Sequence, residues 1–402
     1  MPPELATPRL GPRVEVREAA PLVPLPDAGR PAVAGHGGWR GWYLLWPVAA
    51  YVAVRGLTLA AIAVTNAFVR HDHVYTELYR WDSVWFVRAA THGYPSQLQV
   101  HHGHVAANTI AFFPVFPLLI RGLADVTSIP PAATAIAISG ITGLTSVLAV
   151  GMLARHFAGS EKATRAALLF VVFPGTFAFD MAYSEGVVIT LVALGLLALL
   201  RRQWWLAGVL GLVATATSPV ALAFVVSCAW CSGRAILRDR TWRSLAAPLL
   251  APVGFVAYML YLWAHTGHLT AWRLTELGGW KSYPSVAYPV HILTTFLFDP
   301  VRPTLTGQIL FAGTVVTVVA AVVAVKERQP APVLIYGLLT AALVAVSAPV
   351  GLRPRMIMVA FPLIIAVGTR LRGRAYALVL VASACGLTAM TLLEMFSTSV
   401  FP

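Results

Sequence analysis

The sequence predicts an all-α polytopic membrane protein with about eleven transmembrane helices, and three observations support this fold class. Of the 402 residues, 58% are hydrophobic and only 11% are charged, whereas soluble domains have roughly 25% charged residues. Apolar stretches approach the length of about 20 residues that crosses a bilayer core, and they recur along the chain. Basic residues gather in short segments between these stretches, as in loops that orient membrane helices.

The chain begins with a segment that has no apolar periodicity. Residues 1–41 are rich in Pro, Gly and Arg, so we expect a disordered cytoplasmic tail. The first apolar stretch is too long and too far from the start for a cleaved signal peptide, and we expect it to stay as an anchor. The membrane domain is predicted over residues 42–397, with helices at 42–69, 132–153, 166–182, 186–200, 204–217, 219–232, 245–264, 307–325, 331–348, 356–369 and 375–397.

Positive charge orients these helices. Under the positive-inside rule, 19 of the 29 Lys and Arg residues lie inside and 9 outside, so the N-terminus is predicted in the cytoplasm and the C-terminus outside. The short basic segments assigned to the inside are 155–165, 201–202, 234–243, 326–328 and 370–374. The predicted outer segments are a first loop at about 70–131, a turn at 183–186 and a large loop at about 265–306.

The first outer loop is predicted to lie along the membrane. Residues 110–126 cannot cross it if the loop 155–165 is cytoplasmic, and Pro114 and Pro117 suit a broken element in the outer leaflet. Upstream, Trp81, Val84, Trp85 and Ala89 recur at helical spacing. This pattern indicates an interfacial helix with its tryptophans at headgroup depth.

Two carboxylates on the predicted outer side are candidates for chemistry. Asp82 opens the interfacial helix, where it could simply cap the N-terminus. Glu185 lies in the short turn between two apolar helices, where an ionisable group is costly unless it faces a wet cavity or a partner. The alternative for Glu185 is a helix-start carboxylate that complements the helix dipole. Asp180, one turn earlier, is a weaker candidate of the same kind.

Several arginines lie where positive charge is normally avoided. Arg353 and Arg355 are next to the membrane on the predicted outer side, as a binder of an anionic phosphate would be. Contact with bulk lipid headgroups is the alternative. Arg55, within the first predicted span, could pair with a carboxylate or serve the same cavity.

Other kinds of site are disfavoured. The net charge of +13 comes from membrane-flanking loops, so nucleic-acid binding is not expected. His101, His102 and His104 lie close together without a neighbouring Cys or carboxylate, and we predict neither a metal site nor a cofactor. The three cysteines lie within apolar segments and are interpreted as small core residues.

Three blocks of this sequence resemble the phosphatidylinositol-glycan class V (PIG-V-like) mannosyltransferases, a family of the GT-C class of membrane glycosyltransferases, in a bacterial, actinobacterial-type form. The blocks are Arg80-Trp-Asp-Ser-Val-Trp-Phe-Val-Arg-Ala-Ala-Thr-His-Gly-Tyr94 followed by Ala111-Phe-Phe-Pro-Val-Phe-Pro117, then Phe173-Pro-Gly-Thr-Phe-Ala-Phe-Asp-Met-Ala-Tyr-Ser-Glu185, and Arg353-Pro-Arg-Met-Ile-Met-Val-Ala-Phe-Pro362. The first is the most specific, because it joins Trp-Asp, Gly-Tyr and Phe-Phe-Pro-x-x-Pro in the order of the family.

The resemblance implies a GT-C-like fold and an active site on the extracytoplasmic face of the plasma membrane. It implies transfer of mannose from a polyprenyl-phosphate donor to a hydroxyl of a glycolipid, glycan or protein acceptor, with inversion at the sugar C1. By resemblance Asp82 takes the position of the family's catalytic acid, with Glu185 beside the same cavity. The candidates for substrate binding are Arg55, Arg80, Trp81, Tyr183, Arg353 and Arg355.

One departure leaves alternatives open. Relatives often have an Arg in a Thr-Arg-Pro-like turn after the fifth span, where this chain has Ala214-Thr-Ala-Thr-Ser-Pro219. A substrate contact is therefore in doubt, and a non-catalytic relative that scaffolds other enzymes is one alternative. A transporter or flippase of a lipid-linked or anionic solute is another, although the sequence has no matching pair of interrupted spans of the kind an inverted repeat produces.

Overall fold

The computed structural model describes residues 42–65, 67, 78–298 and 304–396. The predicted tail lies outside the described residues, and so do the start of the first predicted outer loop, part of the later one and residue 397. The described residues belong to one compact unit. Helices dominate it, and only two short two-stranded sheets are present among these residues.

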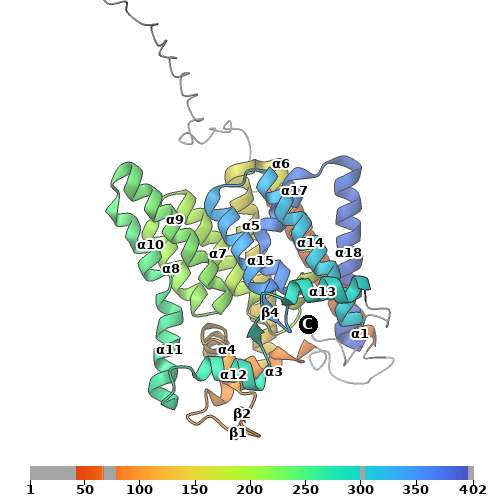
Figure 1. The fold of residues 1–402 in the computed structure, drawn as a ribbon. Coiled ribbons are helices and arrows are strands. Elements are labelled where there is room, and N and C mark those ends of the chain that lie inside the picture. Colours follow the sequence, from red (N-terminus) through yellow and green to blue (C-terminus); the bar gives the residue numbers. More distant parts are fainter. Residues whose placement is uncertain (1–41, 66, 68–77, 299–303, 397–402) are drawn as a thin grey trace, which may run out of the picture. The chain divides into compact units, whose positions relative to one another are not determined.

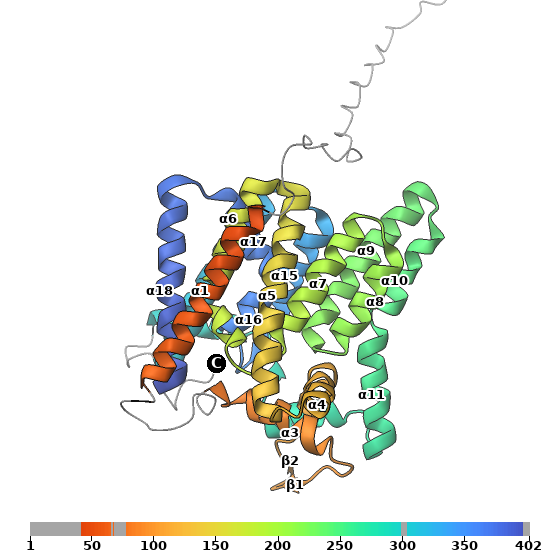
Figure 2. The same cartoon turned by 180° about the vertical axis from the view of Figure 1, so that it is seen from behind.

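Most helices of this unit run side by side in a bundle (Figure 1), and Figure 2 shows the same bundle from behind. The helices of the bundle are α1 (Trp42–Thr65), α5 (Pro131–Ala158), α6 (Ser160–Val171), α7 (Glu185–Leu200), α8 (Trp204–Thr215), α9 (Leu222–Asp239), α10 (Ala246–Leu250), α11 (Val253–Thr266), α14 (Leu305–Lys326), α15 (Ala331–Ala345), α17 (Phe361–Arg370) and α18 (Gly373–Phe396). The central helix is α5, which packs against α1, α4, α6 and α7.

One end of the bundle carries the irregular and short elements, and we call it the α3 end. These elements are α3 (Asp82–His92), the strands β1 (Val100–His101) and β2 (His104–Val105), α4 (Val115–Thr127), α12 (Ala271–Gly279), β3 (Tyr283–Pro284), α13 (Tyr288–Phe298) and β4 (Ser347–Ala348). In the chain they come from the first and the later predicted outer loops and from the segment after α15. The fold therefore brings these distant segments to the same end.

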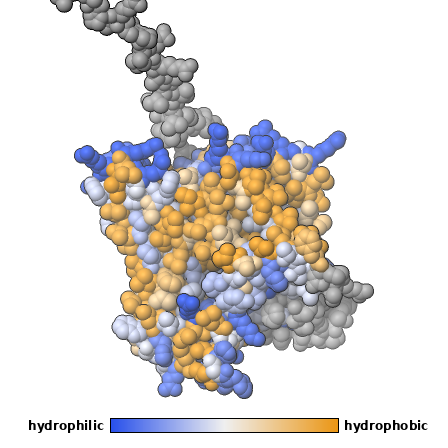
Figure 3. Space-filling view, in the orientation of Figure 1, coloured by the Kyte–Doolittle hydropathy of each residue, from blue (hydrophilic) through white to orange (hydrophobic). Residues whose placement is uncertain are grey.

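The protein is a multi-pass membrane protein. Among the described residues, five helices are long and apolar enough to cross a bilayer, and a bent pair, Trp242–Leu250 with Val253–Thr266, would make a sixth. Shorter apolar helices occupy further predicted spans, including α7, α8, α15 and α17. Large apolar side chains stay exposed on outward faces, for example on α14 and α18, and Figure 3 shows a broad apolar band. The predicted number of eleven crossings stays a prediction.

The predicted helix 166–182 has different bounds in the structure. α6 starts at Ser160 and ends at Val171, and a 3-10 helix over Pro174–Phe179 follows it. Pro174 lacks the backbone N–H that would continue the helix, which explains the break. The predicted loop 155–165 is mostly helical, because Gly159 alone, at φ 86°, turns the chain between α5 and α6.

The segment 110–126, predicted not to cross the membrane, is broken as expected. A 3-10 turn over Thr109–Ala111 precedes α4, and Pro114 immediately precedes the first residue of α4. At 13 residues, α4 is about 20 Å long, shorter than the roughly 30 Å of a bilayer core. It packs against α3 and α5 at the α3 end.

The other end of the bundle carries most of the basic turns, and we call it the basic end. Arg202, after α7, is ion-paired with Asp239 at the end of α9. Arg370 is ion-paired with Glu327, at 3.2 Å, so the turns after α14 and α17 also meet there. In Figure 3 this end is the hydrophilic upper edge. The segments predicted to share the cytoplasmic side thus lie together.

Candidate active site

Arg355 joins the two predicted catalytic acids. It lies in α16 (Pro354–Val359), and its Nη1 donates to Oδ2 of Asp82 at 2.7 Å. Its Nε lies 3.3 Å from Oε1 of Glu185, an ion pair without hydrogen-bond geometry. Asp82 is the first residue of α3 and Glu185 the first of α7. We call these three residues the acid–arginine cluster.

The three side chains of the cluster differ in their access to solvent. The side chain of Arg355 is 9% exposed and that of Glu185 13%, whereas that of Asp82 is 28% exposed. The guanidinium carbon of Arg355 lies 4.6 Å from the ring centre of the buried Tyr183, within cation–π range. Asp82 is therefore the more accessible of the two acids, and Tyr183 packs against the arginine.

Asp82 does not cap its helix. The N-cap residue of α3 is Trp81, and no side chain makes a capping hydrogen bond there. The Asp82 carboxylate binds Arg355 instead, so the capping interpretation is wrong. Trp81 has φ 55° and ψ −125°, a conformation that costs a non-glycine residue about 1–3 kcal/mol and that is found mainly at functional sites.

Two close contacts position the elements of the cluster. Gly175, in the 3-10 helix before α7, packs against the backbone of Pro354 and Arg355, where a Cβ atom would collide with the Pro354 carbonyl. The backbone N–H of Ala182 donates to Oγ of the buried Ser83 at 3.2 Å. The segment between α6 and α7 thus holds both α16 and the start of α3.

Arg55 forms a second buried ion pair. Its Nη1 lies 2.5 Å from Oδ2 of Asp180 and donates to the carbonyl of Thr176 at 2.7 Å, and the Tyr51 ring lies beneath its guanidinium. None of its contacts is with the acid–arginine cluster. The sequence analysis predicted that Arg55 either pairs with a carboxylate or serves the same cavity as Arg353 and Arg355. The structure shows the carboxylate pair.

This pair is expected to stabilise the fold. Replacing Asp180 by alanine leaves the Arg55 charge buried without its carboxylate, which typically costs about 3–5 kcal/mol. We expect a much lower unfolding temperature of the detergent-solubilised protein. Asp239→Ala is the matched control, because the exposed pair of Asp239 with Arg202 should contribute at most about 1 kcal/mol. Equal effects of the two substitutions would contradict a stabilising role of the buried pair.

A further carboxylate, which the sequence analysis missed, lies beside the cluster. Glu394 on α18 is 4% exposed, and its carboxylate lies beside the Trp81 side chain. Arg80 donates from Nη1 to its backbone carbonyl at 3.3 Å. The charges of Arg355 and Arg353 act on it as well. A lone acid in the last apolar stretch was the available signal, because such a group is costly in a membrane.

Arg353 is the second predicted phosphate ligand, and it lies immediately before α16. Its side chain is partly buried. Burial lowers the pKa of Arg353, and the adjacent Arg355 cation lowers it further. Two guanidinium groups are thus neighbours here, and of these Arg355 already has Asp82 and Glu185 as partners.

The later outer loop contributes Glu276, which the sequence analysis also missed. It lies on α12, whose last residues, Gly278 and Gly279, pack closely on the backbone of Val105 to Ala107. Burial raises the pKa of Glu276 to about 7, and the Asp82 charge adds to this. Glu276 is thus an acid at the α3 end that is electrostatically coupled to Asp82.

The raised pKa of Glu276 predicts a pH effect on stability. Between pH 4.5 and about 7, the Glu276 carboxyl keeps its proton in the folded protein but releases it in the unfolded chain. The Glu276 contribution to the free energy of unfolding therefore has its full value at low pH and decreases as the pH rises through about 7. We expect Glu276→Gln to match the wild type in unfolding temperature near pH 5 and to exceed it near pH 8. Glu161→Gln, at an exposed site of the basic end, should show no such pH-dependent gain. A constant difference at both pH values would refute the prediction.

The other polar clusters of the sequence lie elsewhere. His101, His102 and His104 are exposed on the β1–β2 hairpin. The described ranges contain no group of three or more His, Cys, Asp and Glu residues that could hold a metal ion. Cys228 is buried, whereas Cys385 is exposed on α18, so the interpretation of all three cysteines as core residues is wrong for Cys385.

Comparison with known proteins gives matches to solved structures. ArnT from Cupriavidus metallidurans, in a crystal structure bound to undecaprenyl phosphate, matches with a TM-score of 0.53 at 15% identity, over 90% of this chain and 68% of that one. The apo structure of the same ArnT matches with a TM-score of 0.52 at 15% identity, over 90% of this chain and 66% of that one. Neither a protein-family model nor a curated protein matches the sequence.

At this identity the similarity concerns the fold. The predicted fold class, an all-α polytopic membrane protein, is confirmed, and the fold is similar to that of ArnT. The acid–arginine cluster lies within this fold at the junction of α3, α7 and α16.

Proposed function

We propose that this protein is a membrane glycosyltransferase that moves a sugar from a polyprenyl-phosphate donor to an acceptor hydroxyl. The observation that carries the proposal is the ion-paired cluster in which Arg355 binds both Asp82 and Glu185. These residues lie in the three blocks that resemble the PIG-V-like mannosyltransferases, and the resemblance makes mannose the proposed sugar. The fold supports the donor class, because it resembles that of an ArnT structure bound to undecaprenyl phosphate.

In the proposed reaction, an acceptor oxygen attacks C1 of the donor sugar. Asp82 accepts the hydroxyl proton as the new C–O bond forms, and the bond between C1 and the phosphate oxygen breaks with its electron pair leaving on the phosphate. A positioned base of this kind contributes about 10²- to 10⁴-fold to the rate. With one base on the acceptor side, the displacement is direct and inverts the configuration at C1.

The leaving phosphate needs cationic partners more than it needs an acid. Arg355 and Arg353 are the proposed partners, since the planar guanidinium fork matches phosphate oxygens. Before donor binding, the Nη1 of Arg355 is bound by Asp82. A phosphate that takes over this guanidinium would release the Asp82 carboxylate to accept the acceptor proton, so donor binding and base activation would be coupled.

Glu185 has a supporting role in this scheme. Its Oε1 faces the Nε of Arg355 and its side chain is more enclosed than that of Asp82, which suits a group that holds the arginine while Asp82 changes partner. Arg80 and Trp81 precede Asp82 and are proposed to shape the approach to it. Arg55, engaged with Asp180, is proposed to act through the fold.

The proposed orientation places the α3 end outside the cell and the basic end in the cytoplasm of a plasma-membrane protein. It rests on the uneven distribution of Lys and Arg, which favours basic turns on the cytoplasmic side. A donor carried on a polyprenyl lipid and a membrane-bound or surface acceptor would then meet at the outer leaflet.

The test is direct transfer by the purified protein. Detergent-solubilised or nanodisc-embedded protein is incubated with polyprenyl-phosphate mannose and a membrane glycan extract from cells that lack the gene. Transfer with formation of an α-linked product from a β-linked donor supports the proposal. If no sugar is transferred and the protein instead moves the labelled lipid from one leaflet of a liposome to the other, the transporter alternative is favoured. If the chain is inactive but an active transferase co-purifies with it, the scaffold alternative is favoured.

A further inference from the structure

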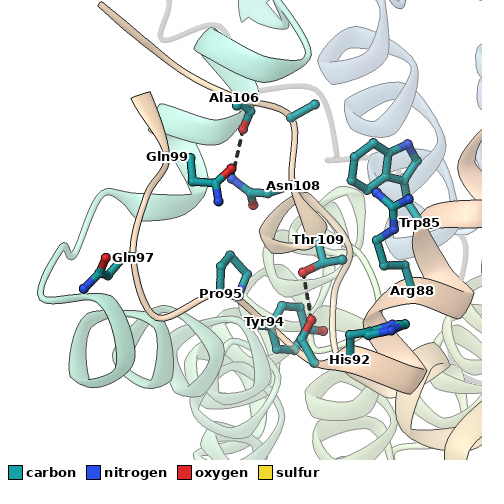
Figure 4. Close-up of a pocket in the computed structure, with 12 residues that line it drawn as sticks. Trp85, Arg88, His92, Tyr94, Pro95, Gln97, Gln99, Ala106, Asn108 and Thr109 are labelled. Carbon is teal, nitrogen blue, oxygen red and sulfur yellow. Dashed lines mark hydrogen bonds between the residues drawn. The ribbon is translucent and has the colours of Figure 1, made fainter. Parts of the chain in front are cut away.

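A pocket of about 280 Å³ lies at the α3 end, beside the C-terminal half of α3. Trp85, Arg88 and His92 of α3 line one side, and the segments from Gly93 to Gln99 and from Ala106 to Thr109 line the rest (Figure 4). Its volume is just below the range of about 300–1,000 Å³ that is usual for small-molecule sites. The pocket is separate from the acid–arginine cluster, since none of those three residues lines it.

The wall of the pocket is held by its own hydrogen bonds. The Asn108 side chain donates to the Ala106 carbonyl at 3.0 Å and accepts from the Ile110 N–H at 2.9 Å. The Thr109 hydroxyl donates to the Gly93 carbonyl at 2.9 Å. Asn108 also reaches Thr275 of α12, at 3.2 Å. A wall with its hydrogen bonds made in this way is a preformed surface rather than a loose loop.

Other polar side chains of the pocket keep some donor or acceptor atoms for which the described residues provide no hydrogen bond. No described residue makes a hydrogen bond with the Gln99 side chain, which Figure 4 shows extending toward Asn108. The guanidinium of Arg88 lies over the Trp85 ring at 4.8 Å and has no carboxylate at ion-pair distance among the described residues. His92 binds Thr91 through Nδ1, at 2.7 Å, and Nε2 has no such contact.

These groups match a ligand rich in hydroxyls. An amide both donates and accepts hydrogen bonds, a guanidinium donates, and an imidazole nitrogen does either. These polar groups can bind the hydroxyls of a sugar ring, and the Trp85 ring at the edge of the pocket can pack against its apolar face. Two other classes of ligand fit less well. A phosphate would need more than one cation in the pocket, and a hydrophobic ligand would leave the Gln99 amide without a hydrogen bond.

The position of the pocket relates it to the proposed reaction. Asp82 and Arg88 are on the same helix, six residues apart, which corresponds to about 9 Å along its axis. We propose that the pocket binds a saccharide unit of the acceptor, next to the unit whose hydroxyl reaches Asp82. The acceptor is then an oligosaccharide or the glycan part of a glycolipid. This inference rests on the proposed function.

The test measures saccharide binding without transfer. Saturation-transfer NMR on the full chain in nanodiscs uses defined probes: the methyl α-glycosides of mannose, glucose and galactose, and α-1,6-mannobiose. The pocket variant is Arg88→Ala with Gln99→Ala, and the matched control is His101→Ala with His102→Ala, two exposed positions of the adjacent hairpin. Loss of two hydrogen bonds should weaken binding of at least one probe about tenfold or more, whereas the control should bind like the wild type.

Each other outcome overturns the inference. Equal binding by the pocket variant would do so, as would the absence of binding of every probe by the wild type. A variant that loses undecaprenyl phosphate binding together with the saccharide would show a donor site instead. Because none of these readouts needs turnover, a protein that binds saccharide in the pocket but transfers no sugar would refute the proposed function while leaving the pocket assignment intact.

Discussion

Replacing Asp82 by asparagine is expected to lower sugar transfer by about 10²- to 10⁴-fold, the contribution of a general base. The asparagine amide has nearly the same size as the carboxylate, and its oxygen can still accept a hydrogen bond from Arg355. It cannot take up the proton of the sugar-acceptor hydroxyl. We therefore expect the Michaelis constant for the donor to change little and kcat to fall. The measurement is initial rates with labelled polyprenyl-phosphate mannose, alongside the unfolding temperature of the same preparation.

A matched acid at the same end of the bundle serves as the control. Asp125 on α4 is exposed, and its only ion pair within the described part of the chain is a long contact, 3.9 Å, with Arg121, so Asp125→Asn should retain wild-type transfer. If Asp82→Asn keeps more than a tenth of the wild-type rate with unchanged folding, Asp82 is not the base.

Replacing Arg355 by alanine is expected to affect both stability and activity. The substitution leaves Asp82 and Glu185 without their shared cation, and breaking a buried ion pair in this way typically costs about 3–5 kcal/mol. It also removes one of the two proposed phosphate partners, so donor binding and kcat should both suffer. The measurements are the unfolding temperature in detergent and the dependence of the transfer rate on donor concentration.

A second substitution separates the two effects. Glu185→Gln combined with Arg355→Ala removes one of the stranded charges, so it should recover part of the lost stability without recovering transfer. Arg353→Ala, in the partly buried position before α16, should raise the donor Michaelis constant with a smaller loss of stability. Full transfer by Arg355→Ala protein would exclude Arg355 from phosphate binding.

Much of the fold could be predicted from hydropathy, because an apolar helix is almost the only way to satisfy the backbone in lipid. The predicted stretches 186–200 and 331–348 correspond to α7 and α15 within a few residues. The error at 166–182 arose where a run of apolar residues continued through Pro174, which breaks the helix without changing the hydropathy. The number of crossings depends on such short elements.

The candidate site could be predicted only as separate residues. Asp82 stood out at the start of the interfacial helix, Glu185 as an acid in a costly position and Arg355 as a cation on the predicted outer side. No spacing in the sequence indicates that one arginine binds both acids. Glu276 and Glu394 were missed because each acts through a contact between distant segments. Only the packing of α12 and α18 against the rest of the bundle reveals their neighbours.

The separation of the ion-pair partners along the chain has a consequence for biogenesis. Arg355 follows Glu185 by 170 residues, which at the usual rate of about 5–20 residues per second is on the order of ten seconds or more of translation. Throughout this interval the nascent protein holds Asp82 and Glu185 without their counter-ion. A ribosome that stops before Arg355 would therefore leave two acids without the cation that pairs with them in the finished fold, so these acids must stay hydrated or take up a proton until α16 is in place.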